Sequence, residues 1–247
     1  MNLLEICVTS LESAIEAELG GANRIELCDN LMEGGTTPSI GMVWECASRL
    51  SIPLHVLIRP RSGDFCYDVN ELSIMKKDIE LMKTIKGVEG FVIGALLPNG
   101  DIDIEVCKEL IEVCKPFNVT FHRAFDVCKD PFKSLETIIK LGCDILLSSG
   151  QEASAEKGLE LLMQLHQQAA GRIEIMPGAG INENNVQLFR DAGFTSLHMS
   201  LRKVKESKMI HRSTQVKLSS LSGDDDCAYS ICDQEKVKKV RAVLNHE

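Results

Sequence analysis

The chain has 247 residues, of which 44% are hydrophobic, and it is therefore long enough to bury one sizeable core. Its 36 acidic and 27 basic side chains leave a net charge of −9, which excludes nucleic acids and anionic membranes as expected partners. No cationic leader stands at the start and no apolar run reaches the roughly 18 residues of a membrane span, so we expect a cytoplasmic protein.

Short aliphatic runs alternate with longer amphipathic segments along the chain, which is typical of successive strand–helix units. An open parallel sheet would give the same local rhythm, but the count of eight runs and the absence of an early Gly-x-Gly-x-x-Gly favour a TIM (β/α)₈ barrel. We expect a single domain over 1–247, with strand–helix repeats over 1–202 and a C-terminal loop and closing helix over 203–247. The eight expected strands are Leu3–Val8, Arg24–Cys28, Leu54–Arg59, Gly90–Ala95, Val119–Arg123, Ile145–Ser148, Ile173–Met176 and Ser196–Met199.

Polar residues and proline mark the expected helix starts between these strands. Thr9 and Glu12 match the Thr-x-x-Glu capping box after the first strand. Asp130 precedes Pro131, a residue that favours the first turn of a helix. After the seventh strand, Asn182 is the expected start of a further helix.

Two of the ten cysteines end the first two strands in matching positions. Glu5-Ile-Cys7 and Glu26-Leu-Cys28 share one Glu-x-Cys spacing, and period-two alternation directs the four side chains to one face of adjacent strands. Two neighbouring thiols suit Cu(I), so Cys7 and Cys28 are candidate metal ligands whose sulfur atoms should lie within about 7 Å. The alternative is that both only fill the barrel. The other cysteines form no Cys-x-x-Cys pair and are expected to be reduced.

Two arginines follow the third strand, where they could bind a substrate. Arg59 and Arg61 each carry a planar guanidinium, which can hold a carboxylate or a phosphate through two hydrogen bonds. Arg61 is the better candidate because it lies beyond the strand. The alternative for Arg59 is that it neutralises Glu5 and Glu26 inside the barrel. His55, near the start of the same strand, is expected to be a core histidine.

His122 ends the fifth strand and is the leading titratable group. A histidine at this end of a barrel can transfer a proton or bind a metal, and a structural hydrogen bond is the alternative. Glu5 and Glu26 are the other candidates for proton transfer in a catalytic site. Asp126 either orients His122 or pairs with Arg123, and the sequence leaves both interpretations open.

The last two strands end in residues that could bind an anion. Gly178 and Gly180 follow the seventh strand, where backbone N–H groups can approach a ligand, and Ser200 follows the eighth. Many barrels bind phosphate between these two loops. A helix starting near Asn182 would direct its positive end toward the same ligand. The alternative is that the glycines only permit a tight turn.

Eight strand-end motifs carry a family resemblance over roughly residues 1–212. They are Glu5–Val8, Arg24–Cys28, Glu33–Ser39, Ile58–Phe65, Thr120–Asp126, Ser148–Gln151, Ile175–Gly180 and His198–Ser200. Read together, these motifs resemble the CutC copper-homeostasis family. The resemblance implies a TIM barrel, a cytoplasmic location and a role in intracellular copper handling, with self-association in some members and no settled reaction. Ser148, Ala179 and Leu201 depart mildly from the usual Thr, Gly and Ala.

Two hypotheses of function follow. The first is a copper-homeostasis protein that binds Cu(I) through Cys7 and Cys28 and needs no organic cofactor. The second is a barrel enzyme of unassigned reaction that acts on a small phosphorylated or carboxylated metabolite, because the density of Arg, His and carboxylate groups exceeds what Cu(I) needs. A purely structural role ranks third, and a homo-oligomer is compatible with each hypothesis.

Overall fold

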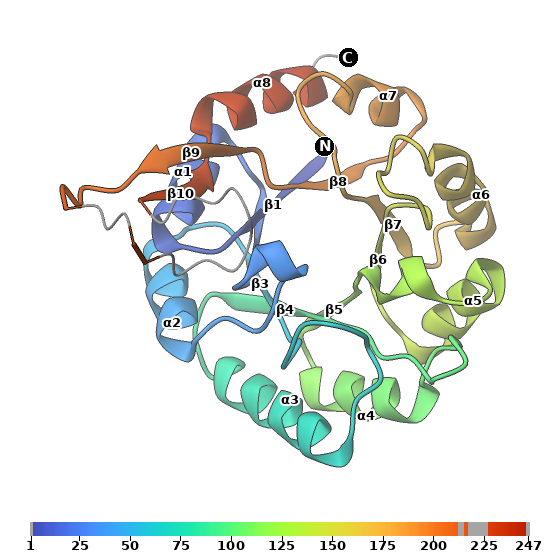
Figure 1. Ribbon diagram of the computed structural model, residues 1–247. Coiled ribbons are helices and arrows are strands. Elements are labelled where there is room, and N and C mark those ends of the chain that lie inside the picture. Colours follow the sequence, from blue (N-terminus) through green and yellow to red (C-terminus); the bar gives the residue numbers. More distant parts are fainter. Residues whose placement is uncertain (1, 212–214, 217–226, 246–247) are drawn as a thin grey trace.

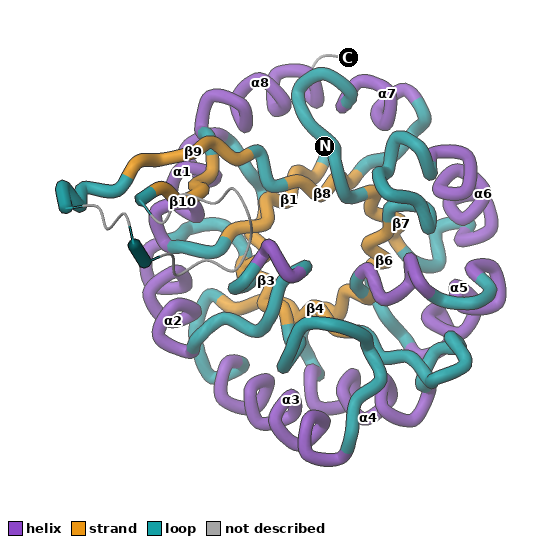
Figure 2. Tube along the Cα trace, viewed as in Figure 1, coloured by secondary structure: helices purple, strands orange, loops and turns teal. Residues whose placement is uncertain are grey.

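Eight parallel strands alternate with helices and form a nearly closed barrel, which confirms the predicted TIM fold (Figures 1 and 2). The computed structural model describes residues 2–211, 215–216 and 227–245. The hydrogen-bonded strand order is β7-β6-β5-β4-β3-β2-β1-β8, so the two ends of this order meet at β7 and β8. The strands are β1 (Leu3–Val8), β2 (Arg24–Leu27), β3 (Leu54–Leu57), β4 (Val88–Ile93), β5 (Asn118–Phe121), β6 (Ile145–Ser148), β7 (Glu174–Pro177) and β8 (Ser196–Met199).

The helices surround the barrel and bury one apolar face each against it (Figure 1). None of the helices in the described ranges combines the length and apolar character needed to cross a membrane. The expected closing helix is present as α8, which packs beside α1 and α7. The helices are α1 (Leu11–Gly20), α2 (Ile40–Arg49), α3 (Val69–Met82), α4 (Ile104–Cys114), α5 (Pro131–Leu141), α6 (Leu159–Ala169), α7 (Val186–Asp191) and α8 (Gln234–Asn245), with short 3-10 helices η1 (Leu31–Glu33) and η2 (Arg123–Val127).

The helix starts agree with the sequence signals only in part. Asp130 caps α5 as predicted, through hydrogen bonds from two backbone N–H groups. The expected box at Thr9 is wrong, because Ser10 is the residue that caps α1. The expected helix start at Asn182 is also wrong. Asn182 takes part in a hydrogen-bonded turn, and α7 begins only at Val186.

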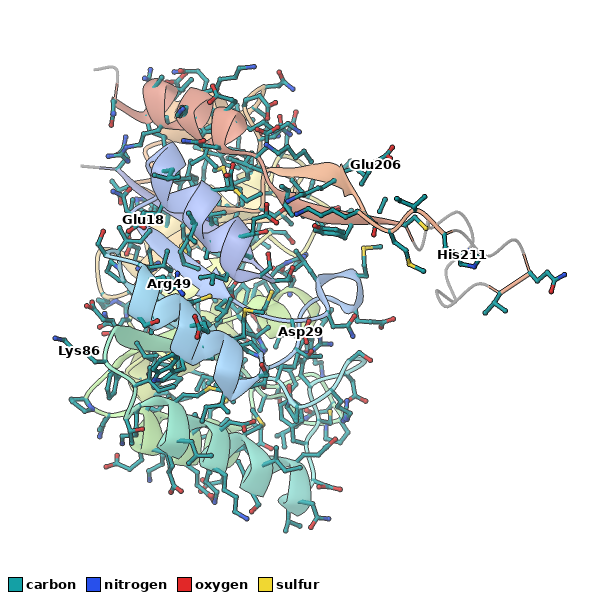
Figure 3. All side chains as sticks on the ribbon, turned by 90° about the vertical axis from the view of Figure 1, so that its left-hand side faces the viewer. Glu18, Asp29, Arg49, Lys86, Glu206 and His211 are labelled. Carbon is teal, nitrogen blue, oxygen red and sulfur yellow. The ribbon has the colours of Figure 1, made fainter. Side chains whose placement is uncertain are left out.

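An antiparallel hairpin replaces part of the expected C-terminal loop. It pairs β9 (Arg202–Glu206) with β10 (Ala228–Cys232) and extends away from the barrel, with Glu206 and His211 on its outer part (Figure 3). This hairpin was hard to predict, because β9 has mostly charged, exposed residues and no apolar run. The loop expected over 219–226 lies outside the described residues.

Two glycines, Gly90 on β4 and Gly94 directly after it, make room for two histidine rings inside the barrel. A Cβ atom added at Gly90 would lie 2.5 Å from the ring of His55, and one added at Gly94 would lie 2.6 Å from the ring of His122. Both histidines are buried, as expected for His55. The absence of a side chain at these two positions therefore leaves space for the His55 and His122 rings.

Candidate functional site

A cavity of about 310 Å³ lies at the carboxyl ends of the strands, where TIM barrels place their functional sites. Residues from every strand end except β4 contribute to its wall, together with the loops that follow. The polar and ionisable lining residues are Cys7, Glu26, Cys28, Arg59, His122, Arg123, His198, Ser200 and Arg202. Most of the residues predicted for the site therefore share one cavity.

The two matched cysteines meet at the wall of this cavity. The sulfur atoms of Cys7 and Cys28 are 3.4 Å apart, which confirms the expected separation. Both side chains are buried, and both are free thiols. The hydrogen bond with Cys28, followed by burial and the charge of Glu26, raises the pKa of Cys7 well above its ordinary value. Cys7 is therefore a protonated thiol at neutral pH, and a metal would have to displace its proton to bind it.

His198 joins the cysteine pair, although the sequence reasoning did not select it as a site residue. The side chain comes from β8, which pairs with β1 and places His198 beside Glu5. Its Nδ1 atom is 2.8 Å from Oε1 of Glu5, and its Nε2 atom is 3.3 Å from Oε2 of Glu26. Ligand atoms of Cys7, Glu26 and His198 all lie within 4.8 Å of one another. His198 could have been selected from the sequence by its position at the end of the last strand of the barrel, two residues before Ser200.

Glu5 and Glu26 differ in electrostatic environment. Burial acts to raise the pKa of Glu5, but Arg24 and His198 outweigh burial and hold it below its ordinary range. Burial, reinforced by the charge of Glu5, raises the pKa of Glu26. Burial acts to lower the pKa of His198, but Glu26 and then Glu5 raise it above its ordinary value. Glu5 is thus a permanently ionised partner of Arg24 and His198.

Arg24, not Arg59, neutralises the buried carboxylate of Glu5. The Nε–H of Arg24 donates a hydrogen bond to Glu5, and the two residues are register partners on β1 and β2. Sequence reasoning overlooked Arg24, although period-two alternation puts it on the same strand face as Glu26. The interpretation of Arg59 as the partner of Glu5 is therefore wrong.

The two arginines after β3 have different surroundings. Arg59 is buried and lines the cavity. Arg61 does not line it and is 38% exposed, with its donors directed to Glu71, to Asp64 at 2.9 Å and to the carbonyl oxygen of Cys66 at 2.9 Å. The expectation that Arg61 is the better ligand contact is not supported, because its guanidinium already binds the loop that carries it.

His122 lines the cavity, but its environment disfavours proton transfer. Its Nδ1 atom accepts a hydrogen bond from the backbone N–H of Ala124 at 3.1 Å. Burial, and then the charge of Arg59, lowers its pKa to about 3. The ring is therefore neutral at physiological pH. Asp126 does not orient it and instead pairs with Arg123 at 2.7 Å, which decides between the two roles considered for that carboxylate.

The loops after β7 and β8 contribute less than expected. Gly180 and Ser200 line the cavity, whereas Gly178 does not and packs beside Leu147 and His198. The α7 helix has only 6 residues and starts well beyond the glycines, so it supplies no anion-binding helix terminus here. The expected anion site is thus not organised around Gly178.

The fold and the site together define a (β/α)₈ barrel protein whose mouth presents two thiols, an imidazole and a carboxylate. The CutC family model matches residues 2–203. The chain belongs to the CutC family.

Curated relatives match along nearly the whole chain. A copper homeostasis protein cutC homolog from Mus musculus is 45% identical over 242 residues, covering 98% of this chain and 89% of the relative. A CutC family protein from Parabacteroides distasonis is 47% identical over 239 residues, covering 96% and 98%. The chain is therefore related to proteins named for copper homeostasis over essentially its full barrel.

Solved structures agree with the fold. The crystal structure of the putative copper homeostasis protein CutC from Streptococcus agalactiae has a TM-score of 0.77 and 34% sequence identity, covering 81% of this chain and 99% of that chain. Phosphoribosylanthranilate isomerase from Thermotoga maritima has a TM-score of 0.59 at 13% identity, covering 100% of both chains. That second likeness shows the barrel fold alone.

Proposed function

We propose that the protein takes part in cytoplasmic copper handling by binding Cu(I) through Cys7 and Cys28. The observation that carries the proposal is the 3.4 Å separation of their sulfur atoms at the cavity wall. Metal–thiolate bonds are about 2.3 Å long, so one ion can contact both sulfur atoms without separating the strands. Thiolates bind Cu(I) in preference to hard cations, and a reducing compartment keeps them free.

His198 is the proposed third ligand. Its Nδ1 atom lies against Glu5, so its Nε2 atom is left on the side of Glu26 and Cys7. A carboxylate that fixes the ring of a metal-binding histidine in this way is a common supporting arrangement. Arg24 holds Glu5 ionised, and Glu5 in turn orients the imidazole. Glu26 is a neighbouring oxygen donor, whose carboxylate suits Cu(I) less well than the thiols do.

A competition titration against a Cu(I) chelator tests the proposal under anaerobic, reducing conditions. Cys7→Ser and Cys28→Ser should each weaken Cu(I) binding by more than the roughly 10- to 100-fold loss typical of an outer-shell substitution. Cys227→Ser and Cys232→Ser are the matched controls and should bind as the wild type does. Equal losses in all four variants would indicate nonspecific thiol binding.

A parallel titration with Zn²⁺ tests the identity of the metal. Two thiolates, an imidazole and a carboxylate are also a ligand set that Zn²⁺ accepts. The proposal expects Cu(I) to displace Zn²⁺ from the wild-type protein at equal concentrations of the two free ions. Retention of Zn²⁺ under those conditions would assign the cysteine pair to zinc and contradict the proposal.

A further inference from the structure

Arg59 is a buried guanidinium with no counter-ion among the described residues. Its residue is only 5% exposed, and no carboxylate in the described part of the chain lies within 4.0 Å of its nitrogen atoms. The carboxylate of Asp64 is close enough to feel its charge, but it is exposed and pairs with Arg61. Burying a charge costs much free energy unless the charge is paired. The described part of the chain therefore contains a buried cation whose charge no neighbouring carboxylate of that part balances.

The donors of Arg59 are only partly used. Nη1 donates to the carbonyl oxygens of Glu33 at 2.9 Å and Gly35 at 2.7 Å, and Nη2 donates to that of Gly63 at 2.7 Å. A guanidinium has five N–H donors, so the Nε–H and one Nη2–H remain. Nε is buried and has no hydrogen-bond partner among the described residues. These two nitrogen atoms are neighbours, as a carboxylate or a phosphate requires for two parallel hydrogen bonds.

His122 supplies a further unused donor. Because Nδ1 accepts the Ala124 N–H, the proton of the neutral ring is on Nε2. That atom is buried and also lacks a partner in the described chain. A buried N–H without an acceptor has lost its hydrogen bond to water and gained none in return, so two such groups in one cavity wall suggest a missing acceptor.

Phe65 brings the two unpartnered groups together. Its ring centroid is 4.9 Å from Cζ of Arg59 and 5.0 Å from the ring of His122. All three residues line the cavity, and Phe65 is only half-buried on the loop between β3 and α3. The described lining residues include three arginines, Arg59, Arg123 and Arg202, and one carboxylate, Glu26, and the charge of Arg123 is balanced by Asp126. The described lining therefore carries more basic than acidic side chains, in a chain whose net charge is −9.

We propose that the cavity binds a small organic molecule through a carboxylate or phosphate group, which accepts hydrogen bonds from Arg59 and His122 beside Phe65. This site is distinct from the cysteine pair and does not depend on copper. It also places the anion differently from the sequence expectation, on Arg59 and His122 in place of Arg61 and Gly178. A purely structural role, in which Arg59 holds the surrounding loops through their carbonyl oxygens, would explain three of its N–H donors. It would leave the buried charge and the two remaining donors unexplained.

Isothermal titration calorimetry of the metal-free protein tests the proposal, with sodium malonate and sodium phosphate as probes and sodium chloride at equal ionic strength as the reference. His122→Asn removes the Nε2–H while its side-chain oxygen can still accept the Ala124 N–H. Arg59→Lys keeps the charge and removes the planar fork. Each should weaken binding of the preferred probe at least about tenfold, a difference of roughly 1.4 kcal/mol. Arg61→Lys is the matched control and should bind as the wild type does.

The two probes distinguish a carboxylate ligand from a phosphorylated one. Saturable binding of malonate alone assigns a carboxylate ligand, and saturable binding of phosphate alone assigns a phosphorylated one. If neither probe binds the wild type beyond the chloride reference, Arg59 is only a loop clamp and the proposal fails. Wild-type affinity in a folded His122→Asn protein would also overturn it. If circular dichroism shows that Arg59→Lys does not fold, the affinity of the His122→Asn protein for the probe is the deciding test of the proposed anion site.

Discussion

At the scale of single residues, the site depends on charges that are buried and paired. Arg24 and Glu5 are both nearly inaccessible to solvent, and their ion pair fixes the carboxylate against which His198 rests. A buried ion pair contributes little net stability, but removing one partner leaves the other charge uncompensated. The same reasoning makes the unpaired guanidinium of Arg59 informative, because it has no such partner among the described residues.

Substitution of Arg24 should reveal this dependence. Arg24→Ala removes the guanidinium partner of buried Glu5 and leaves only His198 beside that carboxylate, so we expect the free energy of unfolding to fall by about 3–5 kcal/mol. Arg49→Ala is the control, because Arg49 pairs with Glu45 on an exposed helix surface, where a loss of at most about 0.5 kcal/mol is expected. Urea denaturation of the two variants measures both changes. Similar losses in both would show that burial of the pair is energetically unimportant.

At the scale of elements, glycines on and directly after β4 set where the histidine rings can lie. A Cβ atom at Gly94 would meet the His122 ring at 2.6 Å, a contact that the surrounding strands give little room to relieve. Gly41, on the exposed side of α2, has no heavy atom within 4 Å of an added Cβ. Glycine is therefore needed at position 94, where a ring fills the adjacent space, whereas a larger residue fits at position 41 on the open helix surface.

We expect Gly94→Ala to lower the free energy of unfolding by about 1–3 kcal/mol through overpacking. Gly41→Ala should raise it by up to about 1 kcal/mol, because alanine is the better helix former. Thermal unfolding of the two variants in parallel gives the comparison. A Gly94→Ala protein as stable as the wild type would mean that the His122 ring can move aside without cost.

The elements that were predicted have a sequence pattern within their own residues, whereas the elements that were missed depend on contacts with distant parts of the chain. The β1 to β8 strands follow apolar runs, whereas β9 is charged and is defined by its pairing with β10. The cysteine pair was predictable because one spacing recurs on two adjacent strands. His198 was not, because its contact with Glu5 joins residues 193 positions apart and exists only once the barrel closes.

At the scale of the whole molecule, closure of the barrel places β8 beside β1 and gathers ionisable side chains in its interior. Burial lowers the pKa of His55 to about 4 and that of His122 to about 3. In the unfolded chain both pKa values return to about 6.5. The unfolded state then binds more protons than the folded state below that pH, so acid should favour unfolding.

Each of these two histidines contributes stability that is fully present above about pH 6.5 and is lost as the pH falls toward the folded pKa, by up to about 1.4 kcal/mol per pH unit. His198 has a raised pKa and contributes in the opposite sense, so its stabilisation is lost as the pH rises through its folded value. Glu26, whose pKa is also raised, acts in the same sense as His198. Urea denaturation of the wild type and of the double variant His55→Gln/His122→Asn between about pH 7 and about pH 5 isolates the contribution of the two histidines with lowered pKa values. The double variant should lose less stability toward acid than the wild type does, and the same pH dependence in both proteins would contradict the assigned burial.

X-ray absorption at the copper edge of the Cu(I)-loaded protein tests the central claim most directly. The account predicts two sulfur neighbours at about 2.3 Å, by analogy with comparable thiolate sites, together with one lighter donor atom. The double variant Cys7→Ser/Cys28→Ser should lose the sulfur shell entirely. Copper surrounded only by nitrogen and oxygen in the wild type, or a sulfur shell that persists in the double variant, would contradict the proposed site.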